Sequence, residues 1–172
     1  ITYSISGACG ATDTENILVN VDADATILPV GPYCSNVIPT NLIGNDPGGV
    51  WSGTGIIDPA TGLFDPALAG AGTHTIAYSI GGVCPDVQTY DLIVDLFLDA
   101  TITASTPFCE SNTAVNLTAV DAGGSWSGNG ITDAIAGTFN PSVASPGLWT
   151  VTYTIPGACG SSDSEDVLVI AD

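Results

Sequence analysis

The sequence predicts an all-β chain built from tandem copies of one small unit, and three observations lead to that prediction. Cys9, Cys84 and Cys159 are spaced 75 residues apart, and Trp51 and Trp126 keep the same spacing. Short segments alternate β-branched or aromatic residues with polar ones, which is the period of a strand with one buried face. No window shows a sustained helical period with caps, so we expect helices to be absent or limited to single turns.

The repeat divides the chain of 172 residues into three parts. Residues 1–24 are expected to be the C-terminal part of a preceding repeat, residues 25–99 a complete repeat, and residues 100–172 a nearly complete one. The sequence contains no Met and no leader with basic and apolar regions, which indicates a fragment or a mature segment.

Each unit ends in two candidate strands. Residues 73–80 (THTIAYSI) and 148–155 (LWTVTYTI) alternate clearly, and residues 90–94 and 166–170 follow after Gly-rich turns. Weaker strands are expected at 26–30, 39–43 and 50–52, with counterparts at 101–105, 114–118 and 125–127. Six or seven short strands in so small a unit favour an immunoglobulin-like β-sandwich, and tandem units of this kind form a rod.

A glycine-rich segment surrounds one Trp in each unit. It reads DPGGVWSGTGI at residues 46–56 and DAGGSWSGNGI at residues 121–131. Such a Trp either fills the sandwich core or lies exposed as a platform on which sugars stack, and the core is the commoner place. The aromatic residues expected in the core are Trp51, Trp126, Phe64, Phe139, Tyr78 and Tyr153.

Each unit carries one early and one late cysteine. Disulfides from Cys34 to Cys84 and from Cys109 to Cys159 would close loops of about 50 residues, which stabilises a small domain by roughly 4 kcal/mol. Cys9 would then pair with a cysteine upstream. The alternative pairs Cys9 with Cys34 and Cys84 with Cys109 and bridges neighbouring units; we favour the first, although sequence leaves both open.

Other uses of these cysteines are less compatible with the sequence. Two cysteines per unit, with neither a CxxC motif nor a repeated His, do not supply the four ligands of a structural zinc site. Disulfides instead indicate an extracellular or periplasmic location.

The charge excludes several classes of function. The chain has 18 carboxylates, no Lys or Arg and a net charge of −18, so binding to nucleic acid or to an anionic membrane surface is not expected. Its apolar stretches are too short to insert into a membrane. The single His, His74, aligns with Trp149 in the next unit, so no catalytic base recurs, and we expect no enzyme.

Calcium is the ligand most compatible with this composition, because hard cations prefer oxygen ligands. No EF-hand loop is present, and the alternative is that these carboxylates accept hydrogen bonds within turns. The weak calcium candidates, at the unit junctions and in turns, are Asp24, Asp99, Asp46, Asp121, Asp58 and Asp133. Apart from calcium, no cofactor is expected.

Four motifs together resemble a known family. They are GGxWSGxGIxD, GxFxP, AGAGTHTIAYSI and TYTIPGACGSSDSEDVLV. They resemble the Ig-like repeats of giant cell-surface adhesins of the Bacteroidota, which include SprB-like proteins associated with gliding motility. The resemblance covers essentially the whole chain. It implies an all-β repeat that is exported by the type IX secretion system and displayed at the cell surface in long arrays.

We therefore expect a structural or stalk repeat of a secreted cell-surface adhesin or extracellular filament, with a mechanical role in adhesion or gliding motility. The expected partners are neighbouring repeats, with lateral self-association and surface glycans as further candidates. The linker at residues 94–100 lacks Gly and Pro, so the units should be stiffly coupled, with Leu96, Phe97 and Leu98 buried between them. The alternative function is a carbohydrate-binding module of a secreted multidomain protein, which requires exposed Trp side chains on one face.

Overall fold

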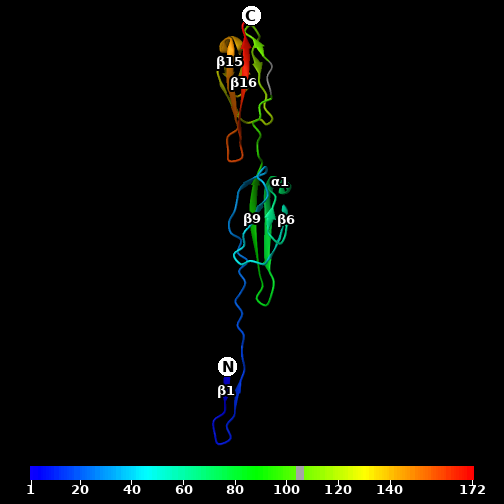
Figure 1. Cartoon of the computed structure of the whole chain (residues 1–172), viewed down its shortest axis with the longest axis vertical. Coiled ribbons are helices and arrows are strands. Elements are labelled where there is room, and N and C mark those ends of the chain that lie inside the picture. Colours follow the sequence, from blue (N-terminus) through cyan, green and yellow to red (C-terminus); the bar gives the residue numbers. More distant parts are fainter. Residues whose placement is uncertain (104–106) are drawn as a thin grey trace.

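The computed structural model describes residues 1–103 and 107–172. Figure 1 shows an elongated chain, in which an N-terminal hairpin and an extended segment lead into two β-rich units stacked end to end. We call residues 25–95 the first unit and residues 100–170 the second unit, and we call residues 75 positions apart equivalent.

Two sheets form the first unit. In one, the order is β3 (Tyr33–Cys34), β9 (Asp86–Asp95), β8 (Gly72–Ile80) and β5 (Val50–Ser52). In the other, it is β4 (Thr40–Asn41), β7 (Leu63–Phe64) and β6 (Ile56–Asp58). β8 and β9 form a long antiparallel hairpin, whereas β3 runs parallel to the end of β9.

The second unit repeats this arrangement. Its larger sheet has the order β10 (Phe108–Cys109), β16 (Ser162–Ile170), β15 (Gly147–Thr154) and β12 (Ser125–Gly128). Its smaller sheet has the order β11 (Val115–Asn116), β14 (Thr138–Phe139) and β13 (Ile131–Asp133). The prediction of an all-β chain of tandem immunoglobulin-like sandwiches is confirmed.

Each unit encloses its own core. Alternation along the long hairpin places Ile76 and Tyr78 of β8, and Leu92 and Val94 of β9, on the buried face. The repeated aromatic side chains all lie in the cores, at Trp51, Phe64 and Tyr78 and at Trp126, Phe139 and Tyr153. Each Trp packs against the Tyr across from it, with ring centroids 4.3 Å apart in the first unit and 4.6 Å apart in the second.

Each unit contains one single-turn helix, α1 (Pro66–Ala69) or α2 (Pro141–Ala144). Asp65 caps α1 by accepting hydrogen bonds from two backbone N–H groups, and Asn140 caps α2 by accepting from the backbone N–H and the hydroxyl of Ser142. A proline begins each helix, where its missing N–H costs nothing. In the described part of the chain, neither helix is long enough to cross a membrane.

The early strands differ from the expectation. Residues 26–30 form only an isolated bridge between Ile27 and Gly44, and residues 39–43 contribute only the short strand β4. At 101–105, Ile102 bridges to Ala119, while residues 104 and 105 lie outside the described residues. β3 and β10 were not predicted, because a two-residue strand is too short to show a period.

The N-terminal segment has strands but no core. β1 (Thr2–Ser4) and β2 (Thr12–Thr14) form a small hairpin. Tyr3 is 69% exposed and Val19 is 84% exposed, whereas their equivalents in both units are buried. The hairpin therefore presents to solvent the face that a complete unit covers.

One glycine in each unit allows the Trp to reach its place. Gly62 has φ of +71°, and a Cβ built on it would lie 2.7 Å from Nε1 of Trp51. Gly137 has φ of +68°, and its Cβ would lie 2.6 Å from Nε1 of Trp126. A side chain at either position would meet both an unfavourable backbone angle and the indole ring.

Gly62→Ala is expected to lower the unfolding free energy of the first unit by about 2–5 kcal/mol, from backbone strain together with overpacking. Gly48 is the matched control, because its φ is +91° but nothing lies within 4 Å of its Cβ position. Gly48→Ala should lose only about 1–2 kcal/mol. Urea unfolding followed by circular dichroism measures both, and equal losses would contradict packing of the Trp against Gly62.

Candidate functional site

The two cysteines of one unit lie at opposite ends of it. Cys34 is in register with Asp95 at the end of β9, whereas Cys84 precedes Asp86 at the beginning of that strand. A strand of this length separates its ends by about 30 Å, and a disulfide requires Cα atoms within about 7 Å. The predicted bridge from Cys34 to Cys84 is therefore wrong, and the one from Cys109 to Cys159 is wrong for the same reason.

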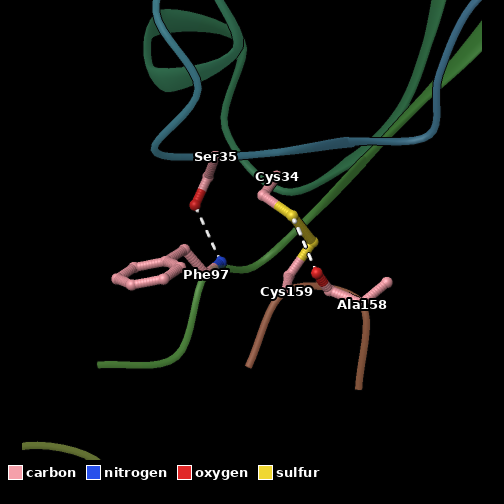
Figure 2. The surroundings of a disulfide bond; sticks show 5 residues. All are labelled: Cys34, Ser35, Phe97, Ala158 and Cys159. Atoms are coloured by element: carbon pink, nitrogen blue, oxygen red, sulfur yellow. Dashed lines mark hydrogen bonds between the residues drawn. A yellow bond between two sulfur atoms is a disulfide. The ribbon is translucent and has the colours of Figure 1, made fainter. Parts of the chain in front are cut away.

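A disulfide joins the two units instead. Cys34, at the end of the first unit, is bonded to Cys159 in the β15–β16 hairpin loop of the second, with Cα atoms 5.4 Å apart (Figure 2). The bridge spans 125 residues of sequence. Within the described residues, Cys9, Cys84 and Cys109 are free thiols, so the alternative pairing was also wrong. An upstream partner for Cys9 stays a prediction.

Hydrogen bonds surround this bridge. The backbone N–H of Phe97 donates to Oγ of Ser35 (3.0 Å; Figure 2). The backbone N–H of Leu98 donates to the carbonyl of Cys159 (2.9 Å), so the linker contacts both units. The sulfur of Cys34 lies 3.6 Å from the carbonyl oxygen of Ala158. This is a van der Waals contact and not a hydrogen bond, because a disulfide sulfur has no proton to donate.

The linker is also fixed to the hairpin of the second unit. Oγ of Ser161 accepts from the N–H of Ala100 (2.7 Å) and donates to the carbonyl of Leu98 (2.8 Å). Phe97 and Leu98 are half-buried, and Leu98 packs on the second core. Leu96 is 61% exposed, so the expectation that it is buried between the units was wrong.

At the start of each unit, an Asp side chain accepts a hydrogen bond from the backbone. The N–H of Asp24 donates to Asp46 (2.9 Å), and the N–H of Asp46 donates to the carbonyl of Asp24 (3.1 Å). Asp99 and Asp121 form the same pair in the second unit, at 2.8 and 3.0 Å. Each pair ties the first residues of a unit to its glycine-rich loop.

Hydrogen bonds to two of these junction carboxylates favour their charged forms. The hydrogen bond from the hydroxyl of Thr26 is the main cause that lowers the pKa of Asp24, and the bond from the backbone N–H of Thr26 lowers it further. The hydroxyl and N–H of Thr101 lower the pKa of Asp99 in the same way.

Asp58 and Asp133 shape turns. Asp58 accepts from the hydroxyl of Thr61 (2.8 Å) and the N–H of Ala60 (2.9 Å), and these bonds lower its pKa. Asp133 accepts hydrogen bonds from the backbone N–H groups of Ala136 and Ile135. Both bonds lower its pKa, and the bond from Ala136 has the larger effect. Nowhere among the described residues do three or more metal-ligating side chains cluster. Calcium binding by these carboxylates stays a prediction.

The sequence did not reveal why His74 and Trp149 are equivalent. Nε2 of His74 lies 2.8 Å from the carbonyl oxygen of Gly70, just after α1, and Nε1 of Trp149 donates to the carbonyl of Ser145 (2.8 Å), just after α2. Because a carbonyl oxygen only accepts, Nε2 of His74 carries the proton. The two rings differ, but each supplies one N–H donor to the end of a helix.

Comparisons with known proteins were made at three levels. No protein-family model matches the sequence, and no curated protein matches it. Among solved structures, the chain is similar to the crystal structure of mouse cadherin-23 EC22-24, with 15% identity and a TM-score of 0.33, over 99% of this chain and 73% of that one. A match this distant carries no argument about function.

Disulfide mapping of the native chain should identify a single bridge. Because the chain has no trypsin site, an Asp-specific protease, which places each cysteine on a separate peptide, is used without reduction. We expect one linked peptide pair containing Cys34 and Cys159, with iodoacetamide on Cys9, Cys84 and Cys109. A bridge from Cys34 to Cys84 would overturn the joint described above.

The lowered carboxyl pKa values predict a dependence of stability on pH. A group whose folded pKa lies below its ordinary value of 3.8 contributes stability above that pH, which is lost as pH falls through the folded value. Between about pH 5 and pH 2, the unfolding free energy of Asp133→Asn should therefore fall less steeply than that of the unmodified chain.

The control for this measurement is Asp22→Asn, which removes the same charge from the exposed N-terminal segment. Acid protonates carboxylates throughout this acidic chain and so reduces the repulsion between them. The Asp22→Asn chain measures how much removing one such exposed charge changes the pH dependence. If Asp133→Asn and Asp22→Asn show the same slope, the turn hydrogen bonds do not contribute to the pH dependence.

Proposed function

We propose that this chain is part of a load-bearing rod, a structural repeat of a secreted cell-surface adhesin or extracellular filament. The observation that carries the proposal is the disulfide from Cys34 to Cys159, which joins two complete units end to end in addition to the linker.

Two connections at one joint restrict how the units can move. With the linker alone, the two units would be free to bend and twist about a single stretch of chain. The disulfide adds a second covalent link, and the hydrogen bonds of Phe97 and Leu98 hold the linker between these two points. The pair of units should therefore respond to force as one stiff segment.

The bridge also defines the route of tension through the chain. A pull on the two termini passes from Ala25 to Cys34, crosses to Cys159, and continues through β16. Residues 35–158 lie inside the disulfide loop, so the covalent path between the two ends bypasses them. Most of both units is thereby protected from being pulled open.

Location and composition support the same proposal. A structural disulfide is stable in oxidising, extracellular or periplasmic surroundings. The sequence motifs resemble repeats of giant Bacteroidota adhesins, which supports export by the type IX secretion system, display at the cell surface and a role in gliding motility. A net charge of −18 keeps parallel rods apart, so lateral association would require cations from the medium.

The carbohydrate-binding alternative receives less support. It requires exposed Trp side chains, but Trp51 and Trp126 are 4% and 6% exposed and pack against core tyrosines. Trp149 is half-buried and has a His as its equivalent in the first unit.

Single-molecule extension of the full chain, held by tags at its termini, tests the mechanical proposal. With the bridge intact, only residues outside the disulfide loop of residues 35–158 can extend. Reduction, or Cys34→Ser with Cys159→Ser, should add on the order of 400 Å of contour length.

The matched control is Cys84→Ser with Cys109→Ser, which removes as many cysteines but leaves the bridge intact. Its extension should equal that of the unmodified chain. A full-length extension of the oxidised, unmodified chain at low force would contradict a load-bearing joint.

A further inference from the structure

The joint between the two units has a partial copy at the other end of the first unit. There, the N–H of Ala23 donates to the carbonyl of Cys84 (3.2 Å), and the equivalent bond at the joint runs from Leu98 to Cys159 (2.9 Å). The N–H of Ala25 is also held by the hairpin, through Oδ2 of Asp86 (2.9 Å). Cys84 thus occupies the same place beside an incoming chain as Cys159 does.

The far end of the second unit reproduces the other half of the joint. Cys109 is in register with Ile170, as Cys34 is with Asp95. The N–H following Cys109, that of Glu110, donates to the carbonyl of Ile170 (2.9 Å), and the equivalent bond from Ser35 to Asp95 is also 2.9 Å. Cys109 is exposed at this end.

Two of the free thiols, those of Cys84 and Cys109, therefore match the two sulfurs of the bridge already formed. Cys109 matches the strand cysteine Cys34, and Cys84 matches the hairpin cysteine Cys159. Their positions are at opposite ends of the stacked pair, so they cannot meet each other within it.

A second and independent observation at the N-terminal end also points to another unit. Ile1, Tyr3, Ile17 and Val19 are each at least 60% exposed, whereas their equivalents Ile76, Tyr78, Leu92 and Val94 are at most 3% exposed. The face that these side chains form in the first unit is covered by the rest of a sandwich. The occupant that fits the hairpin is the first part of another unit of this repeat.

We propose that Cys109 and Cys84 are the two halves of a recurring inter-unit disulfide, each formed with another unit of the same repeat stacked on that end. Cys109 receives the hairpin cysteine of a following unit, and Cys84 reaches the strand cysteine of a preceding unit. The result is a ladder in which every joint carries one bridge that spans 125 residues. This inference rests on the proposed function and names the partner of each end.

The chemistry requires an oxidant, which is a small-molecule or protein disulfide. The thiolate of Cys109 attacks the oxidant disulfide and forms a mixed disulfide, releasing one thiolate. The thiolate of the hairpin cysteine then attacks the Cys109 sulfur and releases the second. The two protons lost by the cysteines are taken up by the released thiolates, so that two thiols are oxidised and one disulfide is reduced.

The C-terminal end is tested with the full chain extended after Asp172 by a second copy of residues 98–172, which continues the repeat in register. The chain is folded with oxidised and reduced glutathione, labelled with iodoacetamide and mapped by mass spectrometry. We expect Cys109 to be bonded to the appended copy of Cys159, so that iodoacetamide labelling of Cys109 falls at least tenfold relative to the unextended chain. The extended chain should still show three labelled thiols, although it has two more cysteines.

The N-terminal end is tested by placing a copy of residues 25–75 before Ile1, which completes the unit to which the hairpin belongs. We expect the copy of Cys34 to be bonded to Cys84, and amide exchange at Tyr3 and Val19 to slow. Cys34→Ser in the copy alone is the control and should leave Cys84 fully labelled while the new unit still folds.

Every one of these chains contains Cys34 and Cys159, and formation of their bridge reports correct folding. It therefore distinguishes failure of the ladder from failure of the proposed function. If it forms while Cys109 and Cys84 stay labelled in the extended chains, or if Cys109 bonds to any other cysteine, the ladder is wrong and the proposed function stands. If it fails to form in the unextended chain, the joint and the proposed function are both wrong.

Discussion

The arrangement of the first unit depends on one constraint: its first ten residues run alongside its last strand from end to end. In the first unit, Ala25 is held by Asp86 at the start of β9, the carbonyl of Val30 accepts from the hydroxyl of Tyr90 (2.9 Å), and Cys34 pairs with Asp95 at its end. A parallel pair of this kind has both chains entering at one end and leaving at the other. The early cysteine is carried to the far end of the unit, and the turn before β9 keeps the late cysteine at the near end.

End-to-end stacking follows from this constraint. A unit that enters at one end and leaves at the other can only be continued along its axis, and the short linker keeps the next unit close. The hairpin loop of the second unit then faces the exit of the first unit, which is where Cys34 lies. The edge strand β3, which closes the larger sheet of the first unit, thereby positions Cys34, the cysteine that connects the two units.

The sequence predicted the sandwich and its core well, because alternation and an uninterrupted period are properties of each unit that local patterns record. It predicted the wrong disulfide for a physical reason as well. A bridge within the unit was favoured because it would staple each unit by itself, but that argument says nothing of where two residues lie along a strand about 30 Å long. The parallel pairing of Cys34 with Asp95 decides the matter, and a strand of two residues leaves no periodic signal. The junction role of Ser161 and the shared donor of His74 and Trp149 were hidden because their equivalents differ in residue type.

The absence of Lys and Arg explains which interactions hold the units together. Asp and Glu side chains have almost no cationic partner in this sequence, so they are stabilised by backbone N–H groups and by Thr hydroxyls, as at Asp24, Asp58 and Asp99. Such bonds act over short distances and depend little on the long-range screening that weakens surface ion pairs in salt. The joint follows the same rule, since it consists of a disulfide, backbone amides and serine hydroxyls and involves no ion pair. A rod built in this way can carry a large uniform charge along its length and still keep joints that salt does not loosen.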